Sequence, residues 1–137
     1  MFRTISLALL ATVGLTLAGC GPSVGPRTAA APILVKVIGV DGKPLKNVTI
    51  SFSPTTANQL PGDFILDDSG TPAKSVQGGP AELIPGTYSI YFQEGGGKDR
   101  SKFATAFKAV PKKYTLQGQT GIELPIGSAE QTITLTP

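Results

Sequence analysis

Apolar and polar residues alternate with a period of two in several short segments of this 137-residue chain. In the clearest segment three apolar side chains alternate with three hydroxyl-bearing ones: Val48, Thr49, Ile50, Ser51, Phe52 and Ser53. Successive side chains of a strand point to opposite faces, so this segment predicts a strand with a buried apolar face and its hydroxyls towards solvent. Further strands are predicted at 33–40, 64–66, 87–92, 122–126 and 131–136.

Two segments have a less regular pattern. Residues 73–77 predict a weak strand in a stretch that is otherwise hard to interpret. Residues 103–110 predict a strand with Phe103, Thr105 and Phe107 on one side. Pro111 has no N–H to give to a sheet, so it is expected to end this strand.

Turn signals separate the predicted strands. Asp41-Gly42 and Pro85-Gly86 are dipeptides typical of tight turns, and 54–62 predicts a loop rich in Thr, Asn and Pro. Three consecutive glycines at 95–97 predict the tip of a hairpin. Pro125 favours an edge position for the strand that contains it.

Together these signals predict an all-β fold. Seven to nine short strands, 17 glycines, 12 prolines and no amphipathic helical pattern indicate a single antiparallel β-sandwich of about seven strands. A small closed barrel is the alternative.

The N-terminal segment has a different composition. Arg3 is followed by an uncharged, mostly apolar run at 5–18, which has the length of a secretory signal and is shorter than the roughly 20 residues of a membrane span. Directly after it, Leu17-Ala18-Gly19-Cys20 resembles the lipobox of bacterial lipoproteins, and Cys20 is the only cysteine. An ordinary signal peptide with an incidental cysteine and an uncleaved anchor helix are the alternatives.

The lipobox resemblance implies the organisation of the chain. Residues 1–19 would be removed as a signal peptide, and Cys20 would carry a diacylglycerol and an N-acyl chain that anchor the protein to a membrane. Residues 20–32 would be the lipidated end and a flexible tether, and 33–137 the β-sandwich domain. Gly21 stands where inner-membrane lipoproteins often have an aspartate, so the expected location is the bacterial cell envelope, at the outer membrane.

Three motifs resemble a known family of domains. The segment 40–52, the turn Pro85-Gly86-Thr87-Tyr88 and the sequence Val110-Pro111-Lys112-Lys113-Tyr114 resemble carboxypeptidase regulatory-like domains in small lipoproteins abundant in planctomycete bacteria. The resemblance implies a transthyretin-like sandwich with an accessory or structural role and no catalytic site. The chain departs from the family pattern after Asp68-Ser69-Gly70, between residues 66 and 80.

The residue types argue against an enzyme. There is no histidine, and the lone cysteine is expected to carry lipid, so the commonest general base and the usual zinc ligands are missing. Asp67-Asp68 lacks the spaced oxygen ligands of a calcium loop, and 95–98 lacks the spacing of a phosphate-binding loop. No cofactor or metal is expected, and a net charge of +2 after removal of Arg3 does not imply a nucleic-acid partner.

One cluster of positive charge is a candidate contact for an anionic surface. Its members lie within sixteen residues: Lys98, Arg100, Lys102, Lys108, Lys112 and Lys113. A solvated loop that protects an edge strand is the alternative interpretation.

The expected function is therefore non-catalytic. The leading hypothesis is a structural or protein-interaction role, with the loops at 54–62 and 93–102 presented to another envelope protein. The second is a binding module for cell-surface glycans or another anionic polymer, for which Tyr91 and Tyr114 are the candidate exposed aromatics.

Overall fold

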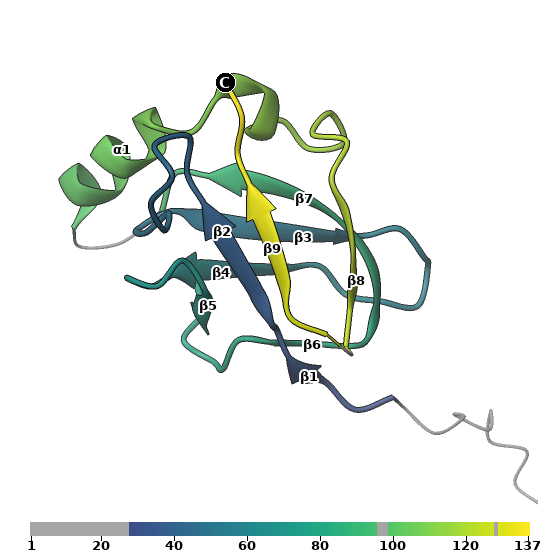
Figure 1. Cartoon of the computed structure of the whole chain (residues 1–137). Helices are drawn as coiled ribbons and strands as arrows, with labels where there is room; N and C mark the ends of the chain where they lie inside the picture. The colour runs from purple at the N-terminus through teal and green to yellow at the C-terminus, as the bar shows by residue number, and fades with distance from the viewer. Residues whose placement is uncertain (1–27, 96–98, 128) are drawn as a thin grey trace, which may run out of the picture.

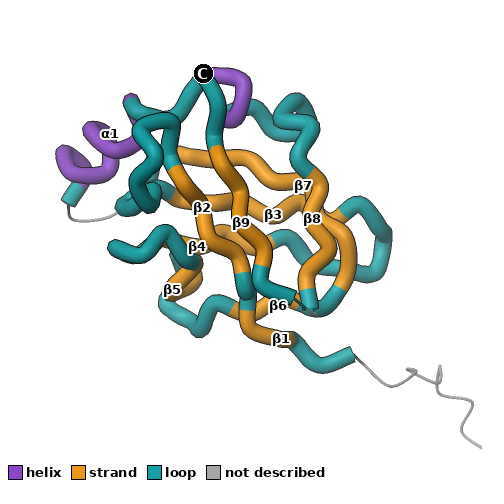
Figure 2. The backbone as a smooth tube through the Cα atoms, in the orientation of Figure 1, coloured by secondary structure: helices purple, strands orange, loops and turns teal. Residues whose placement is uncertain are grey.

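The computed structural model describes residues 28–95, 99–127 and 129–137. They form nine strands, one α-helix and one short 3-10 helix (Figures 1 and 2). The elements are β1 (Ala31–Pro32), β2 (Val35–Ile38), β3 (Thr49–Pro54), β4 (Gly62–Leu66), β5 (Pro72–Ser75), β6 (Glu82–Leu83), β7 (Gly86–Gln93), α1 (Arg100–Lys108), η1 (Lys112–Tyr114), β8 (Glu123–Ile126) and β9 (Gln131–Thr134).

The fold is an all-β sandwich of two layers. The larger layer is an antiparallel sheet with the strand order β5-β4-β3-β7-β8. The second layer is the pair β2-β9, which crosses in front of the larger sheet in Figure 1, and a short pair β1-β6 lies at one end. These open layers confirm the predicted sandwich rather than the closed barrel.

The β2-β9 pair departs from the expected antiparallel arrangement because its strands run in parallel, with Val37 opposite Ile133. Parallel neighbours need a long crossover connection, and here the whole larger sheet lies between them in the sequence. The first and last long strands of the domain therefore run side by side in the same direction.

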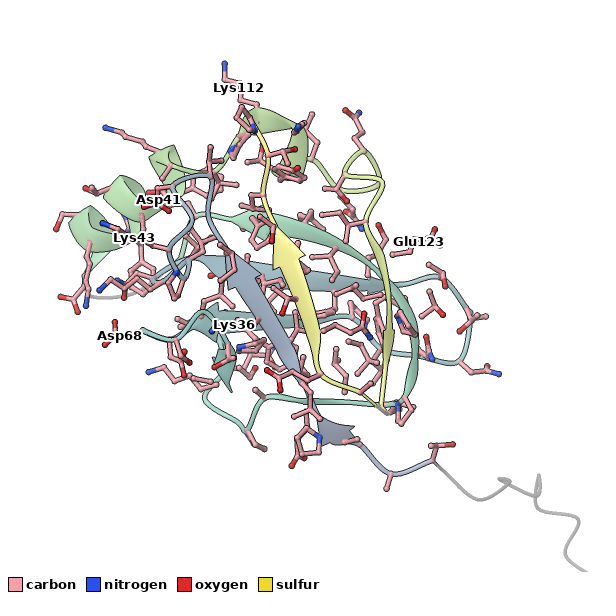
Figure 3. The ribbon with its side chains drawn as sticks, viewed as in Figure 1. Lys36, Asp41, Lys43, Asp68, Lys112 and Glu123 are labelled. Atoms are coloured by element: carbon pink, nitrogen blue, oxygen red, sulfur yellow. The ribbon has the colours of Figure 1, made fainter. Side chains whose placement is uncertain are left out.

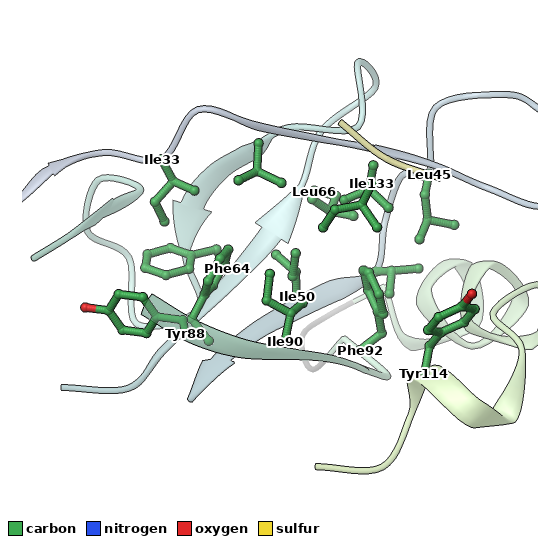
Figure 4. Close-up of a cluster of buried hydrophobic side chains, with 14 of the residues drawn as sticks. Ile33, Leu45, Ile50, Phe64, Leu66, Tyr88, Ile90, Phe92, Tyr114 and Ile133 are labelled. Carbon is green, nitrogen blue, oxygen red and sulfur yellow. The ribbon is translucent and has the colours of Figure 1, made fainter. Parts of the chain in front are cut away.

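The apolar side chains that the alternation predicts to be buried do form the core. Val48, Ile50 and Phe52 are at most 1 % exposed, and Ile90 and Phe92 of β7 are fully buried beside them. Figure 4 shows side chains of both layers interdigitating between the sheets. The Phe52 ring also packs edge-on against the rings of Phe64 and Tyr88, with centroids 5.8 and 6.1 Å apart.

The expected exposure of the β3 hydroxyls is wrong. Thr49 and Ser51 are 4 % and 1 % exposed, because β3 is the central strand and its outer face is covered by side chains of its neighbours. Gln93 Nε2, from the adjacent β7, donates a hydrogen bond of 2.8 Å to Ser51 Oγ. A two-residue period alone cannot distinguish a solvent-facing position from a covered one.

The strand predicted at 103–110 is also wrong, because this segment forms α1 and its C-terminal cap. Alanine, lysine and arginine favour a helix, and Phe103 and Phe107 are four residues apart, so they share one helical face as readily as one strand face. Ala106 and Phe107 pack against the core. The hairpin predicted at 95–97 is wrong as well, since Gly95 leads towards this helix; residues 96–98 lie outside the described residues.

Two turns hold β2 against the larger sheet. The Val37 N–H donates to the Gly70 carbonyl at 2.8 Å, and the Val37 carbonyl accepts from the Leu45 N–H at 2.9 Å. Gly70 has φ +79°, and a Cβ at this position would lie 2.5 Å from the Val37 oxygen. Only glycine combines this conformation with so close an approach.

The predicted turn at Pro85-Gly86 leads into a buried tyrosine. The Tyr88 side chain is fully buried, and its hydroxyl donates a 2.7 Å hydrogen bond to the carbonyl of Ile84. Burial raises the pKa of Tyr88, so the phenol remains a donor. This return from a buried tyrosine to the backbone just upstream is a tyrosine corner, an arrangement typical of β-sandwiches.

Both edges of the larger sheet carry a proline. Pro72 is in β5 and Pro125 is in β8, and each of these strands is four residues long. The predicted edge position of the strand with Pro125 is thus confirmed.

The N-terminal predictions fall largely outside the described residues. Residues 1–27, which include Cys20 and the predicted signal peptide, are not described, and β1 begins at Ala31, within the segment assigned to the tether. Within the described ranges, no helix has both the length and the apolar character needed to cross a bilayer.

We predict that Gly70→Ala destabilises the fold by more than about 3 kcal/mol, because it combines left-handed strain with displacement of the Val37 carbonyl. Gly118→Ala is the matched control, since Gly118 has φ +74° but no atom within 4 Å of a Cβ, and should cost about 1 kcal/mol. Urea unfolding of both variants measures the difference. Equal losses would contradict the role of the close approach.

We predict that Tyr88→Phe costs about 1 kcal/mol, since it leaves the partly buried Ile84 carbonyl without the Tyr88 donor. The control is Tyr91→Phe, which removes a half-buried hydroxyl that accepts a 3.1 Å hydrogen bond from Gln93. The control should cost less than about 0.5 kcal/mol. Thermal unfolding followed by circular dichroism compares the two, and an unchanged midpoint for Tyr88→Phe would rule out the corner as a stabilising contact.

Candidate functional site

The predicted basic cluster lies at one end of the sandwich, in two helices. Arg100, Lys102 and Lys108 are exposed on α1, and Lys112 and Lys113 are exposed on η1. Lys98 lies outside the described residues. Figure 3 shows Lys112 at the tip of this end.

The helix separates its three cations. At 100° per residue, Arg100 and Lys108 lie about 80° apart around the α1 axis, whereas Lys102 lies about 160° from Arg100. Lys102 therefore faces a different direction, towards the connection between β2 and β3. The five members that the structure describes therefore do not all face the same direction.

Lys113 is held by the C-terminal segment. Its Nζ donates to Thr136 Oγ1 at 3.0 Å and to the Pro137 carbonyl at 2.6 Å. It also lies 5.1 Å from the centroid of the Tyr114 ring, within cation–π range. These contacts give Lys113 a structural role.

A groove of about 1,010 Å³ separates α1 from the connection between β2 and β3. Ser101, Lys102 and Thr105 line the helical wall, and Ala106 and Ala109 extend it as an apolar surface. The opposite wall is formed by residues 39–41 and 43–47.

The wall opposite the helix adds two lysines that the sequence did not indicate. Lys43 and Lys46 line the groove together with Lys102. Lys43 and Lys46 were not predicted because the basic cluster was defined as a run of sixteen residues, and these two lysines lie more than fifty residues before it in the sequence. The signal available was the pair of lysines beside the predicted turn at Asp41-Gly42.

Two carboxylates also line the groove, and each has a partner. Asp41 Oδ1 accepts the Lys43 N–H at 3.0 Å, which caps the turn. Asp68 lies 3.5 Å from Lys46 Nζ, in an ion pair whose side chains are 57 % (Lys46) and 88 % (Asp68) exposed. Within the described ranges, the ammonium groups of Lys43 and Lys102 have no carboxylate within 4.0 Å.

The Asp67 carboxylate serves the turn that holds β2. Its Oδ1 accepts hydrogen bonds from the N–H and hydroxyl of both Ser69 and Thr71, at 2.6 to 3.1 Å. Burial acts to raise the pKa of Asp67, but these hydrogen bonds outweigh it and hold the pKa below its ordinary value. No group of three potential metal ligands occurs among the residues described.

The candidate aromatics for a glycan site are not exposed platforms. Tyr114 is 7 % exposed, and its hydroxyl is bound by the Thr136 hydroxyl and N–H, which lower the pKa of Tyr114. Tyr91 is half-buried and accepts a hydrogen bond from Gln93. Neither ring is placed to stack on a neutral sugar.

The segment from α1 to η1 carries an excess of positive charge, although Asp41, Asp68 and Asp99 lie near it. Since Arg3, Arg27 and Lys98 lie outside the described residues, nine basic side chains remain against nine acidic ones. Five of these cations lie between Arg100 and Lys113, a segment without any acid. Glu82 and Glu130 lie at the opposite end, beside β1 and the start of β9.

We predict that stability falls as pH decreases through the depressed pKa of Asp67, below its ordinary value of 3.8. The contribution of the ionised carboxylate is fully present above 3.8, so the deficit of Asp67→Asn should be largest near neutral pH and should shrink below about pH 4. Urea unfolding at several pH values measures this. Asp68→Asn, in the same turn, is the control, and a deficit of Asp67→Asn that stays constant with pH would contradict the prediction.

No family model matches this sequence, and the searches of curated proteins and of solved structures return no match.

Proposed function

We propose that this chain is a non-catalytic lipoprotein of the bacterial cell envelope, anchored through acylated Cys20. The observation that carries the proposal is the sequence Leu17-Ala18-Gly19-Cys20 directly after the apolar run 5–18, with no other cysteine in the chain. A thioether-linked diacylglycerol and an N-acyl chain would bury enough methylene groups to make attachment essentially permanent, since each contributes about 0.8 kcal/mol.

The start of the domain supports this arrangement. Strand pairing begins at Ala31, so ten residues separate Cys20 from β1. A segment of this length can span at most about 35 Å when fully extended. The sandwich would therefore be held close to the membrane yet clear of the lipid headgroups.

The domain itself suits a structural or protein-interaction role. The absence of histidine and the expected loss of the only thiol to lipid leave the sequence without the usual nucleophile and base pair. A transthyretin-like domain of the carboxypeptidase regulatory type would fit this role, and the turn at Asp41-Gly42 and the tyrosine corner after Pro85-Gly86 favour it. The residue Gly21 favours the outer membrane as its location.

We predict that Cys20→Ser abolishes membrane attachment and releases the protein into the soluble envelope fraction. The full chain is expressed in a bacterium with a lipoprotein-processing pathway, and membrane fractions are compared with soluble ones. Mass spectrometry of the wild-type N-terminus should show a mature chain that begins at Cys20 and carries fatty acid. Globomycin, which blocks the lipoprotein signal peptidase, should cause the uncleaved precursor to accumulate.

Ser23→Ala is the matched control, because it lies near the cleavage site and leaves the lipobox intact. It should fractionate like the wild type. A mature N-terminus elsewhere without fatty acid, or a Cys20→Ser variant that stays in the membrane, would refute the proposal.

A further inference from the structure

We propose that the groove between α1 and the β2–β3 connection binds an anionic glycan chain, one that carries carboxylate or phosphate groups at intervals. The position of this chain in the envelope rests on the proposed lipid anchor, whereas the chemistry of the groove does not. The shared ligand chemistry is a sugar polymer with spaced negative charges.

The groove lies at the end of the sandwich remote from the chain entry. β1 pairs with β6 just before the start of β7, while α1 follows the end of β7. The eight residues of β7 extend about 23 Å and connect the end that holds β1 to the end that holds α1. Figure 1 shows β1 and α1 at opposite ends of the domain.

This distance separates the groove from an anchoring membrane. If the ten residues between Cys20 and β1 behave as the predicted flexible tether, their average end-to-end distance is about 17 Å, so a domain held upright on this tether keeps the groove away from the bilayer. At physiological ionic strength the membrane field decays over about 8 Å, so it is negligible at the groove. The cations at this end are therefore directed away from the anchoring membrane.

Both walls of the groove combine cations with apolar side chains, and its three lysines outnumber its two carboxylates, Asp41 and Asp68. Lys43 and Lys102 face it from opposite sides, without carboxylate partners among the described side chains. Between them, Pro44, Ala106 and Ala109 provide a surface on which the C–H faces of sugar rings can pack. Negative groups at intervals along a chain would meet an ammonium group on either side.

The residue types favour a charged glycan over a neutral one or a peptide. Neutral sugars are usually held by exposed aromatic rings, and peptide interfaces rely on aromatic and arginine anchors, but neither aromatic residues nor arginine line this groove. Lysine ammonium groups are hydrated point charges that do not require the fixed bidentate geometry of arginine. They suit a polymer whose repeated charges can bind in several registers.

Charged residues outside the groove also favour binding of an anionic chain at this end of the domain. Arg100, Lys108 and Lys112 lie outside the groove at the same end, and they add attraction for a long anionic chain. Glu82 and Glu130 at the entry end would repel it. A polyanion is thus attracted to one end of the domain.

The test uses the full mature lipoprotein in vesicles of neutral phosphatidylcholine. Labelled oligogalacturonate and a phosphomannan oligosaccharide are the two anionic probes, which distinguish carboxylate from phosphate recognition, and a neutral cello-oligosaccharide is the control ligand. Binding of at least one anionic probe should weaken as salt rises, and the neutral sugar should not bind.

Lys43→Gln/Lys102→Gln should weaken this binding about two- to thirtyfold, given about 0.2–1 kcal/mol for each exposed charge contact. The matched control Lys36→Gln/Lys74→Gln removes the same charge outside the groove and should change affinity less than about 1.5-fold. As a second pair, Thr105→Glu places a carboxylate in the groove, whereas Gln119→Glu places one on a distant exposed loop. Only the first should weaken binding.

Equal losses in the groove variants and their controls would overturn the proposal, because net charge alone would then explain binding. Failure of both anionic probes to bind at low salt would also overturn it. A third arm adds vesicles containing phosphatidylglycerol; binding to these without binding to the polymers would identify a membrane as the partner and refute the glycan. If Cys20 is not acylated but the soluble chain still binds the polymers, the proposed anchor fails while the groove assignment stands.

Discussion

Burial of the apolar side of β2 and β9 against the larger sheet is the interaction on which the rest of the structure depends. Two strands alone are marginal in water, so this pair is stable only because Val35, Val37 and Ile133 pack onto β3 and β7. The turn at Gly70 and the segment at Leu45 fix β2 through its backbone. These contacts also set the position of the β2–β3 connection, and hence of one wall of the groove.

The elements predicted correctly are those whose signal is local. Alternation at 48–53 and 131–136 identifies the buried apolar residues, and Asp41-Gly42 marks a turn in which the Gly42 N–H donates to the Gly39 carbonyl. Pro85-Gly86 forms a bend that leads directly into β7 rather than a hydrogen-bonded turn. The prediction failed where the same residue spacing fits both a helix and a strand, as for Phe103 and Phe107, which are four residues apart and lie in α1. It also failed for Ser51, because its burial depends on neighbours that are distant in the sequence.

The candidate site was predictable only in part, for the same reason. The helical cations form a visible run in the sequence, but their separation around α1 depends on a helix that the pattern did not predict. Lys43 joins Lys102 only through the tertiary fold. The structural role of Lys113 depends on its contacts with Thr136 and Pro137, which no local sequence pattern encodes.

The prolines at both edges of the larger sheet have a consequence for the proposed anchoring of this protein on a membrane. Open strand edges invite pairing between neighbouring copies, and an anchor would raise the local concentration of these copies above that in solution. Pro72 and Pro125 each remove a backbone donor from short strands at these edges. Each edge therefore offers fewer donors to a second copy, which disfavours extension of the sheet from one domain into the next.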